Sequence, residues 1–278
     1  MKLAASNIAW NPAQRLEAYR LLAEAGFGGL EIAPNLFLAS LDDPFCPAPA
    51  EVAARRAEIA AFGLDLVSLQ APLFGVEGVA LFETAAERQR LVEGMERAIR
   101  LAGMLAIPNI VFGSPRQRVV PSGMSADVAE GIAAETLAAL ADLALAEGCK
   151  IALEPNAREY GTNFLTTLED TTRFLDRIDH PALTLNLDFG TLWLSGEIEG
   201  LDLSDCIGRV SHVHISEPML APAPASAAHA ARAVAALRAV NWVGSTSIEM
   251  RMVPDDPGLT VLAGCLRRLG DALEENHE

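Results

Sequence analysis

Four apolar segments of the chain each end in a side chain that can bind a metal ion. Glu154 ends the first, Asp188 the second, His212 or His214 the third and Glu249 the fourth. Carboxylates with a single imidazole form a hard donor set, which suits Mn²⁺, Mg²⁺ or Co²⁺ better than a thiolate zinc site, although Zn²⁺ also accepts it. If the four segments are neighbouring strands that point the same way, the sequence predicts one divalent-metal site.

The segment 183–188 indicates how a strand would present such a ligand. Its odd positions are all leucine and its even positions are all polar. Successive side chains of a strand point to opposite faces, so one face would be apolar and the other would carry Thr184, Asn186 and Asp188. The other three segments place their ligand in the same phase, near the last position of each strand.

Short apolar strands alternate with alanine-rich helices along the whole chain. Eight strand-helix units in 278 residues predict an α/β fold, a (β/α)8 TIM barrel in a single domain over 1–278. A doubly wound open sheet is the competing architecture, but no GxGxxG motif follows the first strand. We expect strands at 2–9, 29–33, 64–70, 109–112, 150–154, 183–188, 209–215 and 246–250, helices at 11–25, 50–62, 84–102, 124–147, 166–178, 226–240 and 257–275, and a helical or irregular stretch after 188.

The active site of a TIM barrel lies at the C-terminal ends of its strands. Barrel interiors are ordinarily filled by Val, Ile and Leu, and buried polar groups are costly unless they are paired or bind a metal. Polar side chains at these strand ends, in phase with one another, therefore favour a functional site. They are Glu31, Gln70, Glu154, Asn156, Asp188, His212, His214, Glu249 and Arg251.

Four motifs, taken in order, resemble the sugar phosphate isomerase/epimerase superfamily, the xylose isomerase-like barrels that include the ketose 3-epimerases. The motifs are I-A-L-E-P-N at 151–156, L-D-F-G at 187–190, H-V-H-I-S-E at 212–217 and S-I-E-M at 247–250. From Glu154 onward the metal-type residues are spaced by 34, 26 and 35 positions, which is similar to the Glu-Asp-His-Glu metal set of that family. The resemblance covers nearly the whole chain.

The resemblance implies that Glu154, Asp188, His214 and Glu249 hold one divalent metal and that Glu154 and Glu249 also do the acid–base chemistry. A ketose bound to the metal through its carbonyl and an adjacent hydroxyl would lose a C–H proton to give a stabilised enediolate. One carboxylate would take the proton and the other would return it. Return on the opposite face gives an epimerase, and return at the neighbouring carbon gives an isomerase. The expected substrate is a sugar or sugar-like polyol.

The substrate-binding residues depart from the family pattern. Thr191 stands where ketose 3-epimerases carry a substrate-binding His, and 217–220 contains no Arg where they carry one. Arg251 can bind a carboxylate or phosphate, or it can form a salt bridge with Glu217. We expect substrate contacts from five polar residues near the strand ends: Gln70, Asn156, His212, Glu217 and Arg251. Arg116 and Arg118, in the loop after the fourth strand, can add positive charge near the site, but we expect that loop to be solvated.

Composition limits which binding partners and which cellular compartment we expect. The net charge of −16 argues against a nucleic-acid partner, since binding a phosphate backbone needs clustered Lys and Arg. No run approaches the roughly 18 apolar residues of a membrane span, and we see no signal peptide. The four cysteines are far apart and form no CxxC pair, so we expect reduced thiols and a cytoplasmic protein. A homo-oligomer is compatible with the sequence.

Proteins with this fold can have other functions, and we consider three alternatives. A lyase or dehydratase would use the same metal and enediolate but expel a leaving group. A non-catalytic barrel would bind its ligand without turnover. An endonuclease of the abasic-site type needs a histidine-rich trinuclear site and a basic face, which five histidines and an acidic chain do not favour.

Overall fold

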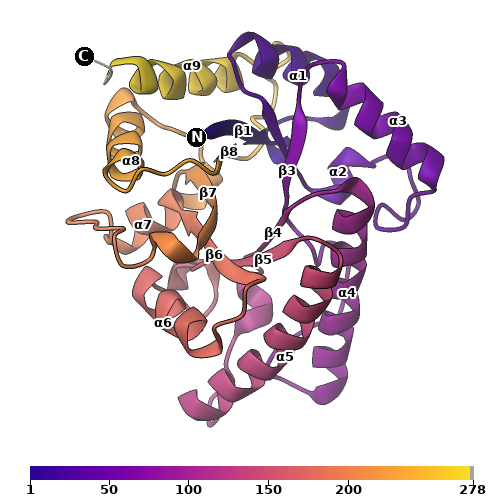
Figure 1. The fold of residues 1–278 in the computed structure, drawn as a ribbon, viewed down its shortest axis with the longest axis vertical. Helices are drawn as coiled ribbons and strands as arrows, with labels where there is room; N and C mark the ends of the chain where they lie inside the picture. The colour runs from indigo at the N-terminus through magenta and orange to yellow at the C-terminus, as the bar shows by residue number, and fades with distance from the viewer. Residues whose placement is uncertain (276–278) are drawn as a thin grey trace.

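In the computed structural model, which describes residues 1–275, eight parallel strands close edge to edge into a barrel (Figure 1). Each strand pairs with the next along the chain, and β8 pairs with β1 to complete the ring. The predicted TIM barrel is therefore confirmed. The strands are β1 (Lys2–Ser6), β2 (Gly29–Ile32), β3 (Asp65–Leu69), β4 (Asn109–Phe112), β5 (Lys150–Leu153), β6 (Leu183–Asp188), β7 (Val210–Ser216) and β8 (Ser245–Glu249).

Helices surround the barrel and bury their apolar faces against it (Figure 1). Several begin at a Ser or Thr whose side chain accepts from a backbone N–H of the first turn, as Thr84 and Ser226 do. Within residues 1–275, no helix has the length and apolarity needed to cross a membrane. The helices are α1 (Arg15–Glu24), α2 (Pro34–Phe37), α3 (Pro49–Ala60), α4 (Ala85–Leu105), α5 (Ala126–Ala146), α6 (Leu168–Ile178), α7 (Phe189–Ser195), α8 (Ala227–Ala239) and α9 (Thr260–Glu274).

Short helical turns occupy several places where the sequence predicts a strand or a loop. The first strand ends at Ser6, because the Ser6 hydroxyl accepts from the backbone N–H of Ile8 and the chain turns into the 3-10 helix η1 (Asn7–Ala9). The expected loop after β2 opens with α2. Further 3-10 turns are η2 (Pro12–Gln14), η3 (Pro115–Arg118), η4 (Arg158–Tyr160), η5 (Ile207–Arg209) and η6 (Pro218–Leu220).

The interior of the barrel is polar as well as buried. All six residues of β6 are buried, so its polar face does not meet solvent. Near the N-terminal ends of the strands, the hydroxyls of Thr184 and Ser211 lie 2.7 Å apart, and Ser211 donates to Asn109 Oδ1 (2.7 Å). Asn109 in turn donates to Ser68 (3.0 Å). These pairings offset the cost of burying polar groups, and they form a floor beneath the strand ends.

Candidate metal and acid–base site

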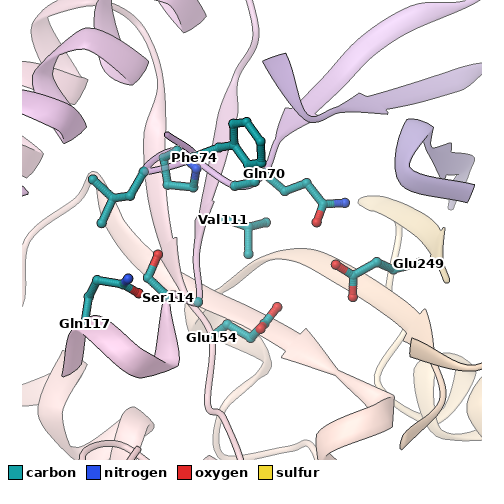
Figure 2. Close-up of a pocket in the computed structure, with 11 residues that line it drawn as sticks. Gln70, Phe74, Val111, Ser114, Gln117, Glu154 and Glu249 are labelled. Carbon is teal, nitrogen blue, oxygen red and sulfur yellow. The ribbon is translucent and has the colours of Figure 1, made fainter. Parts of the chain in front are cut away.

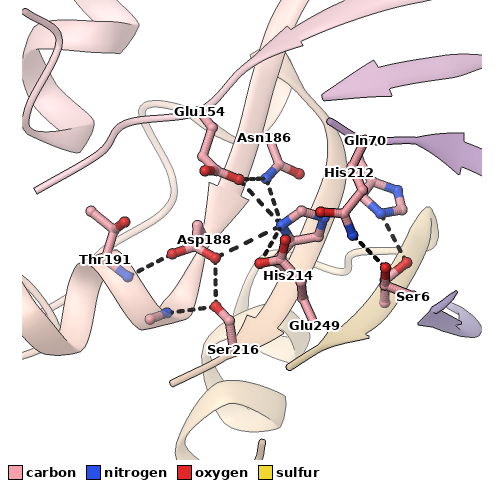
Figure 3. Close-up of polar contacts among 12 residues, drawn as sticks. Ser6, Gln70, Glu154, Asn186, Asp188, Thr191, His212, His214, Ser216 and Glu249 are labelled. Carbon is pink, nitrogen blue, oxygen red and sulfur yellow. Dashed lines mark hydrogen bonds and ion pairs between the residues drawn. The ribbon is translucent and has the colours of Figure 1, made fainter. Parts of the chain in front are cut away.

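Four strands bring the predicted metal ligands together at the mouth of the barrel. Glu154 directly follows β5, Asp188 ends β6, His214 lies in β7 and Glu249 ends β8. One ligand atom from each lies within 4.8 Å of the others (Figure 3). Because parallel strands end at the same rim of the barrel, residues far apart in sequence converge there.

The Nδ1 atom of His214 lies at the centre of the cluster. It is 3.2 Å from Glu154 Oε2, 3.2 Å from Glu249 Oε2 and 3.8 Å from Asp188 Oδ2. Burial alone would lower the pKa of His214, but the carboxylates of Glu249, Glu31 and Glu154 outweigh burial and raise that pKa well above its usual value.

The three carboxylates differ in their pKa values. Burial raises the pKa of Glu249 to about 7 and that of Asp188 to about 6, and the neighbouring Glu154 carboxylate adds to both shifts. Burial also acts to raise the pKa of Glu154, but hydrogen bonds to His214 and Asn156, together with the charges of His214 and Arg118, outweigh burial and lower that pKa. Three buried carboxylates around one imidazole leave an excess of negative charge, which a divalent cation would balance. The donor set therefore fits a hard divalent metal.

The opposite nitrogen of His214 is held by a buried glutamate. Glu31, at 0% exposure, places Oε1 3.1 Å from His214 Nε2 and 3.4 Å from His212 Nε2. Burial acts against ionisation of Glu31, but both imidazoles outweigh burial and lower its pKa. A carboxylate on the far nitrogen fixes the orientation of a ligating imidazole, so Nδ1 is turned towards the three carboxylates.

Neighbouring polar groups also hold the carboxylates (Figure 3). Asn186 Nδ2 donates to Glu154 Oε2 (2.8 Å). Asp188 Oδ1 accepts from the backbone N–H of Thr191 (2.6 Å), and Asp188 Oδ2 accepts from Ser216 Oγ (2.5 Å). Asn186 and Ser216 are not among the expected site residues, although Asn186 shares the phase of Asp188 and Ser216 shares that of His212 and His214, which is a usable signal.

Two cavities border the cluster, and Glu154 and Glu249 line both. The larger, of about 320 Å³, lies by the ends of β3 and β4, where Gln70, Ser114 and Gln117 supply polar groups (Figure 2). Figure 2 shows the carboxylates of Glu154 and Glu249 facing the same space. The smaller cavity, of about 160 Å³, lies by the ends of β5, β6 and β7 and includes Asn156, Tyr160, Asp188, Thr191 and Glu217.

The five residues expected to bind substrate fall in different places. Gln70 and Asn156 line the cavities, as expected of such residues. His212 is fully buried, and its Nε2 lies 3.0 Å from Ser247 Oγ, so it is not placed to touch a substrate. Glu217 lines the smaller cavity but accepts from Ala225 N (2.7 Å) and lies 2.8 Å from His229 Nδ1.

Arg251 and Arg118 lie elsewhere than the sequence predicts. Arg251 is exposed and lines neither cavity, and the salt bridge considered between it and Glu217 is absent from the described residues 1–275. Arg118 is not solvated: it is 0% exposed and donates to the backbone carbonyl of Glu154 (2.9 Å). The expectation of a solvated loop fails there because η3 turns this side chain inward, while Arg116 on the same turn is exposed.

The barrel and its cluster define the class of the protein. The chain belongs to the xylose isomerase-like TIM barrel family, whose model matches residues 19–272. That match confirms the resemblance inferred from the four motifs.

Relatives of known activity narrow the class. The chain is 24% identical over 260 residues to the 3-dehydro-D-guloside 4-epimerase of Escherichia coli (strain K12), covering 92% of this chain and 95% of that one. Its fold is similar to an L-ribulose 3-epimerase (TM-score 0.78, 20% identity, 100% of both chains). It is also similar to the D-psicose 3-epimerase of Clostridium cellulolyticum H10 (TM-score 0.73, 16% identity, 99% of this chain and 98% of that one). The Escherichia coli relative confirms the expectation of an enzyme of the isomerase and epimerase class, and the two solved structures show the shared fold.

Proposed function

We propose that this protein is a divalent-metal-dependent epimerase or isomerase of an uncharged keto sugar or related polyol. The observation that carries the proposal is the convergence of Glu154, Asp188, His214 and Glu249 within 4.8 Å at the barrel mouth. Glu154 and Glu249 also face the two cavities that would hold a substrate.

The four ligand-type side chains would hold a single Mn²⁺, Mg²⁺, Co²⁺ or Zn²⁺ ion. Such an ion, when bound, supplies Lewis acidity to a substrate carbonyl, which makes the neighbouring C–H more acidic. The direction of the His214 ring supports this assignment, because Glu31 holds Nε2 and leaves Nδ1 facing the carboxylates.

Glu154 and Glu249 would move the proton. Both carboxylates line the two cavities but reach them from different strands, Glu154 from the end of β5 and Glu249 from the end of β8. A proton can therefore leave the substrate toward one carboxylate and return from the other. Glu154 would accept the proton from the substrate carbon, and Glu249 would donate one from its own side.

The cavity linings support an uncharged substrate. Among residues 1–275, no Lys, Arg or His lines either cavity. The linings offer amides and hydroxyls such as Gln70, Ser114 and Thr191, which hydrogen-bond to sugar hydroxyls. A phosphate or carboxylate would instead meet Asp188, Glu217 and Glu249 with no cationic side chain to pair with it.

The compartment is a smaller part of the proposal. We propose a cytoplasmic protein, supported by its four free cysteines, three of them buried. Thiols that lie unpaired are ordinary in a reducing compartment.

Exchange of a carbon-bound proton tests the reaction without knowledge of the final product. The protein is loaded with Mn²⁺ and incubated in deuterated water with a panel of free ketoses and keto-glycosides, and NMR follows loss of the C–H signal next to the carbonyl. We expect metal-dependent exchange on at least one sugar, and no exchange by Glu154→Gln. Glu159→Gln, an exposed carboxylate in the same loop, is the matched control and should exchange normally. Absence of exchange on every sugar, with the metal bound, would reject the proposal.

A further inference from the structure

A buried arginine lies directly behind Glu154. Arg118 ends η3 and is fully buried. Its Nη2 donates to the backbone carbonyl of Glu154 (2.9 Å) and to Asn156 Oδ1 (2.5 Å). Nε and Nη1 are buried and have no hydrogen-bond partner within residues 1–275. The guanidinium lies over the Phe112 ring, 5.9 Å from its centroid.

Burying this guanidinium is costly. Burial lowers the pKa of Arg118 to about 10, so the group still carries its charge at neutral pH. Two of its donor atoms are unsatisfied, while the third makes both hydrogen bonds to the Glu154–Asn156 segment. Stability alone does not favour an arginine here, since an apolar side chain of similar volume would avoid both costs.

Arg118 fixes which way the Asn156 amide points. A guanidinium has donors and no acceptor, so it must face the carbonyl end of the amide. The amino end of Asn156 is then directed to Glu154, where Nδ2 donates to Oε1 over 2.7 Å. A flipped amide would turn its carbonyl oxygen toward the Glu154 carboxylate, which is also an acceptor.

The Glu154 carboxylate is consequently held at both oxygens. Asn156 binds Oε1, and Asn186 binds Oε2 over 2.8 Å. Gly113 leaves the space that this carboxylate occupies, because an added Cβ there would lie only 2.8 Å from Glu154 Oε1. Proton transfer to a carboxylate depends on placement, and a displacement of about 1 Å can cost on the order of 10²-fold in rate.

We propose that Arg118 is a positioning residue that fixes the Glu154 carboxylate through the side-chain amide of Asn156. This inference rests on the proposed function, in which Glu154 accepts a proton from the substrate. Arg118 itself is out of reach of the substrate, because it lines neither cavity.

A double-mutant cycle tests this chain of contacts from Arg118 through Asn156 to Glu154, which we call the relay. Arg118→Met, Asn156→Ala and the double variant are compared for kcat and KM of sugar exchange. We expect each single substitution to lower kcat by about 10- to 100-fold with KM changed much less, as for other groups that orient catalytic ligands. The double variant should be little worse than either single one, because both break the same chain of contacts. Additive losses would overturn the proposal.

Asn156→Asp separates positioning from packing. This variant keeps the size of the side chain and gives Arg118 a charged partner, but it removes the donor to Glu154 Oε1. We expect kcat to fall as in Asn156→Ala while thermal unfolding stays close to that of the unchanged protein. A variant with undiminished kcat would refute the relay, even if Arg118→Met does not fold. Arg116→Met, on the exposed side of the same turn, is the control and should leave kcat unchanged.

Mn²⁺ affinity gives a second reading that needs no substrate. Glu154 Oε2 faces His214, so a loosened carboxylate should also bind metal less tightly. We expect Arg118→Met to raise the Kd for Mn²⁺ several-fold, and to change it little when Asn156 is already Ala. If the protein exchanges no sugar, the proposed function fails, but the Mn²⁺ affinities of the same variants still test the relay. An equal effect of Arg118→Met on the Kd in the unchanged protein and in Asn156→Ala would contradict the relay.

Discussion

At the scale of single residues, the imidazole of His214 lies between two sets of acidic side chains. Its Nδ1 faces Glu154, Asp188 and Glu249, and its Nε2 faces Glu31. This orientation of the ring suits both sides, because in a metal-bound state Nε2–H would donate to Glu31 and Nδ1 would present its lone pair to the metal. Glu31 therefore acts on the site through His214 without touching the substrate.

Replacing Glu31 tests this arrangement. Glu31→Gln keeps an acceptor near His214 Nε2 but removes the charge that supports the ring. We expect Mn²⁺ affinity, measured by calorimetry, to fall by about 10- to 100-fold with the fold intact. Glu159→Gln, an equal change of charge on an exposed carboxylate, should have no effect. Unchanged affinity in Glu31→Gln would contradict the role given to Glu31.

Metal binding should also depend on pH in a definite direction. In the metal-free protein the pKa of Glu249 is raised to about 7, that of Asp188 is raised to about 6, and that of His214 is raised well above its usual value. Protons on these groups favour the folded state below the usual pKa of each group, and that contribution is lost as pH rises through the raised values. Glu154 and Glu31, with lowered pKa values, are ionised throughout this range.

The expected result follows from competition between protons and the metal. Mn²⁺ should bind more tightly at pH 8 than at pH 6, release protons, and raise the thermal unfolding temperature more at the higher pH. Calorimetry in buffers of different ionisation enthalpy measures the proton release. Equal affinity at the two pH values, with no protons released, would show that these groups are not the ligands.

The phase of side chains along the strands predicts that ligand-type residues meet at one rim of the barrel, but it does not distinguish His212 from His214, and only the family resemblance favours His214. His212 and His214 share one side of β7, and two residues of a strand advance by roughly 6.6 Å. His212 therefore lies one layer deeper, against Ser247. The buried position of Arg118 could not be predicted from the sequence, since the direction of its side chain is set by how η3 packs on the loop after β5.

At the scale of elements, the junction of β6 and α7 gives Asp188 two tasks. Asp188 is the N-cap of α7 and accepts from the backbone N–H of Thr191, while its other oxygen faces His214. Ser216 of β7 ties the junction together, because its hydroxyl donates to Asp188 and accepts from Gly190 N (2.8 Å). The Asp188 carboxylate thus fixes the start of α7 at the end of β6, and it also fixes its own position beside His214.

Two substitutions of Asp188 separate these tasks. Asp188→Asn keeps an acceptor for the helix cap but loses the charged ligand, whereas Asp188→Ala loses both. Both should bind Mn²⁺ poorly. In the metal-free protein at pH 8, Asp188→Ala should be less stable than Asp188→Asn by about 1 kcal/mol, the usual contribution of an N-cap. Denaturant unfolding measures the difference, and equal stability would argue against the cap.

The larger elements follow from the sequence, and the smaller ones do not. Alternating strands and helices are marked by long apolar patterns, which local chemistry specifies. A three-residue turn such as η1 depends on one hydroxyl, that of Ser6, capping the chain. The polar floor of Asn109, Thr184 and Ser211 depends on which residues of different strands become neighbours, and that is decided only when the barrel closes.

At the scale of the whole molecule, charge is the property that we expect to select the substrate. The chain carries a net charge of −16, and its cavities add acidic groups without a lining Lys or Arg in residues 1–275. A dianionic phosphate would be repelled both at a distance and within the site, although salt weakens the long-range part.

Comparison of a ketose with its phosphate tests this selection. We expect the kcat/KM of the free sugar to exceed that of the phosphorylated one by roughly tenfold or more, since about 1.4 kcal/mol of unfavourable contact is sufficient for tenfold. Exchange kinetics at two ionic strengths measure the ratio. A preference for the phosphorylated sugar would overturn the proposal of an uncharged substrate.

The position of a bound ion tests the account most directly, because His214 belongs to two clusters of metal-type residues, Glu154–Asp188–His214–Glu249 and Glu31–His212–His214. A crystal grown with Mn²⁺ and measured at the manganese absorption edge would locate the ion by its anomalous scattering. We expect one strong peak within bonding distance of Glu154, Asp188, His214 Nδ1 and Glu249. A peak between Glu31 and His212, or none at saturating Mn²⁺, would contradict the metal site on which the proposed chemistry depends.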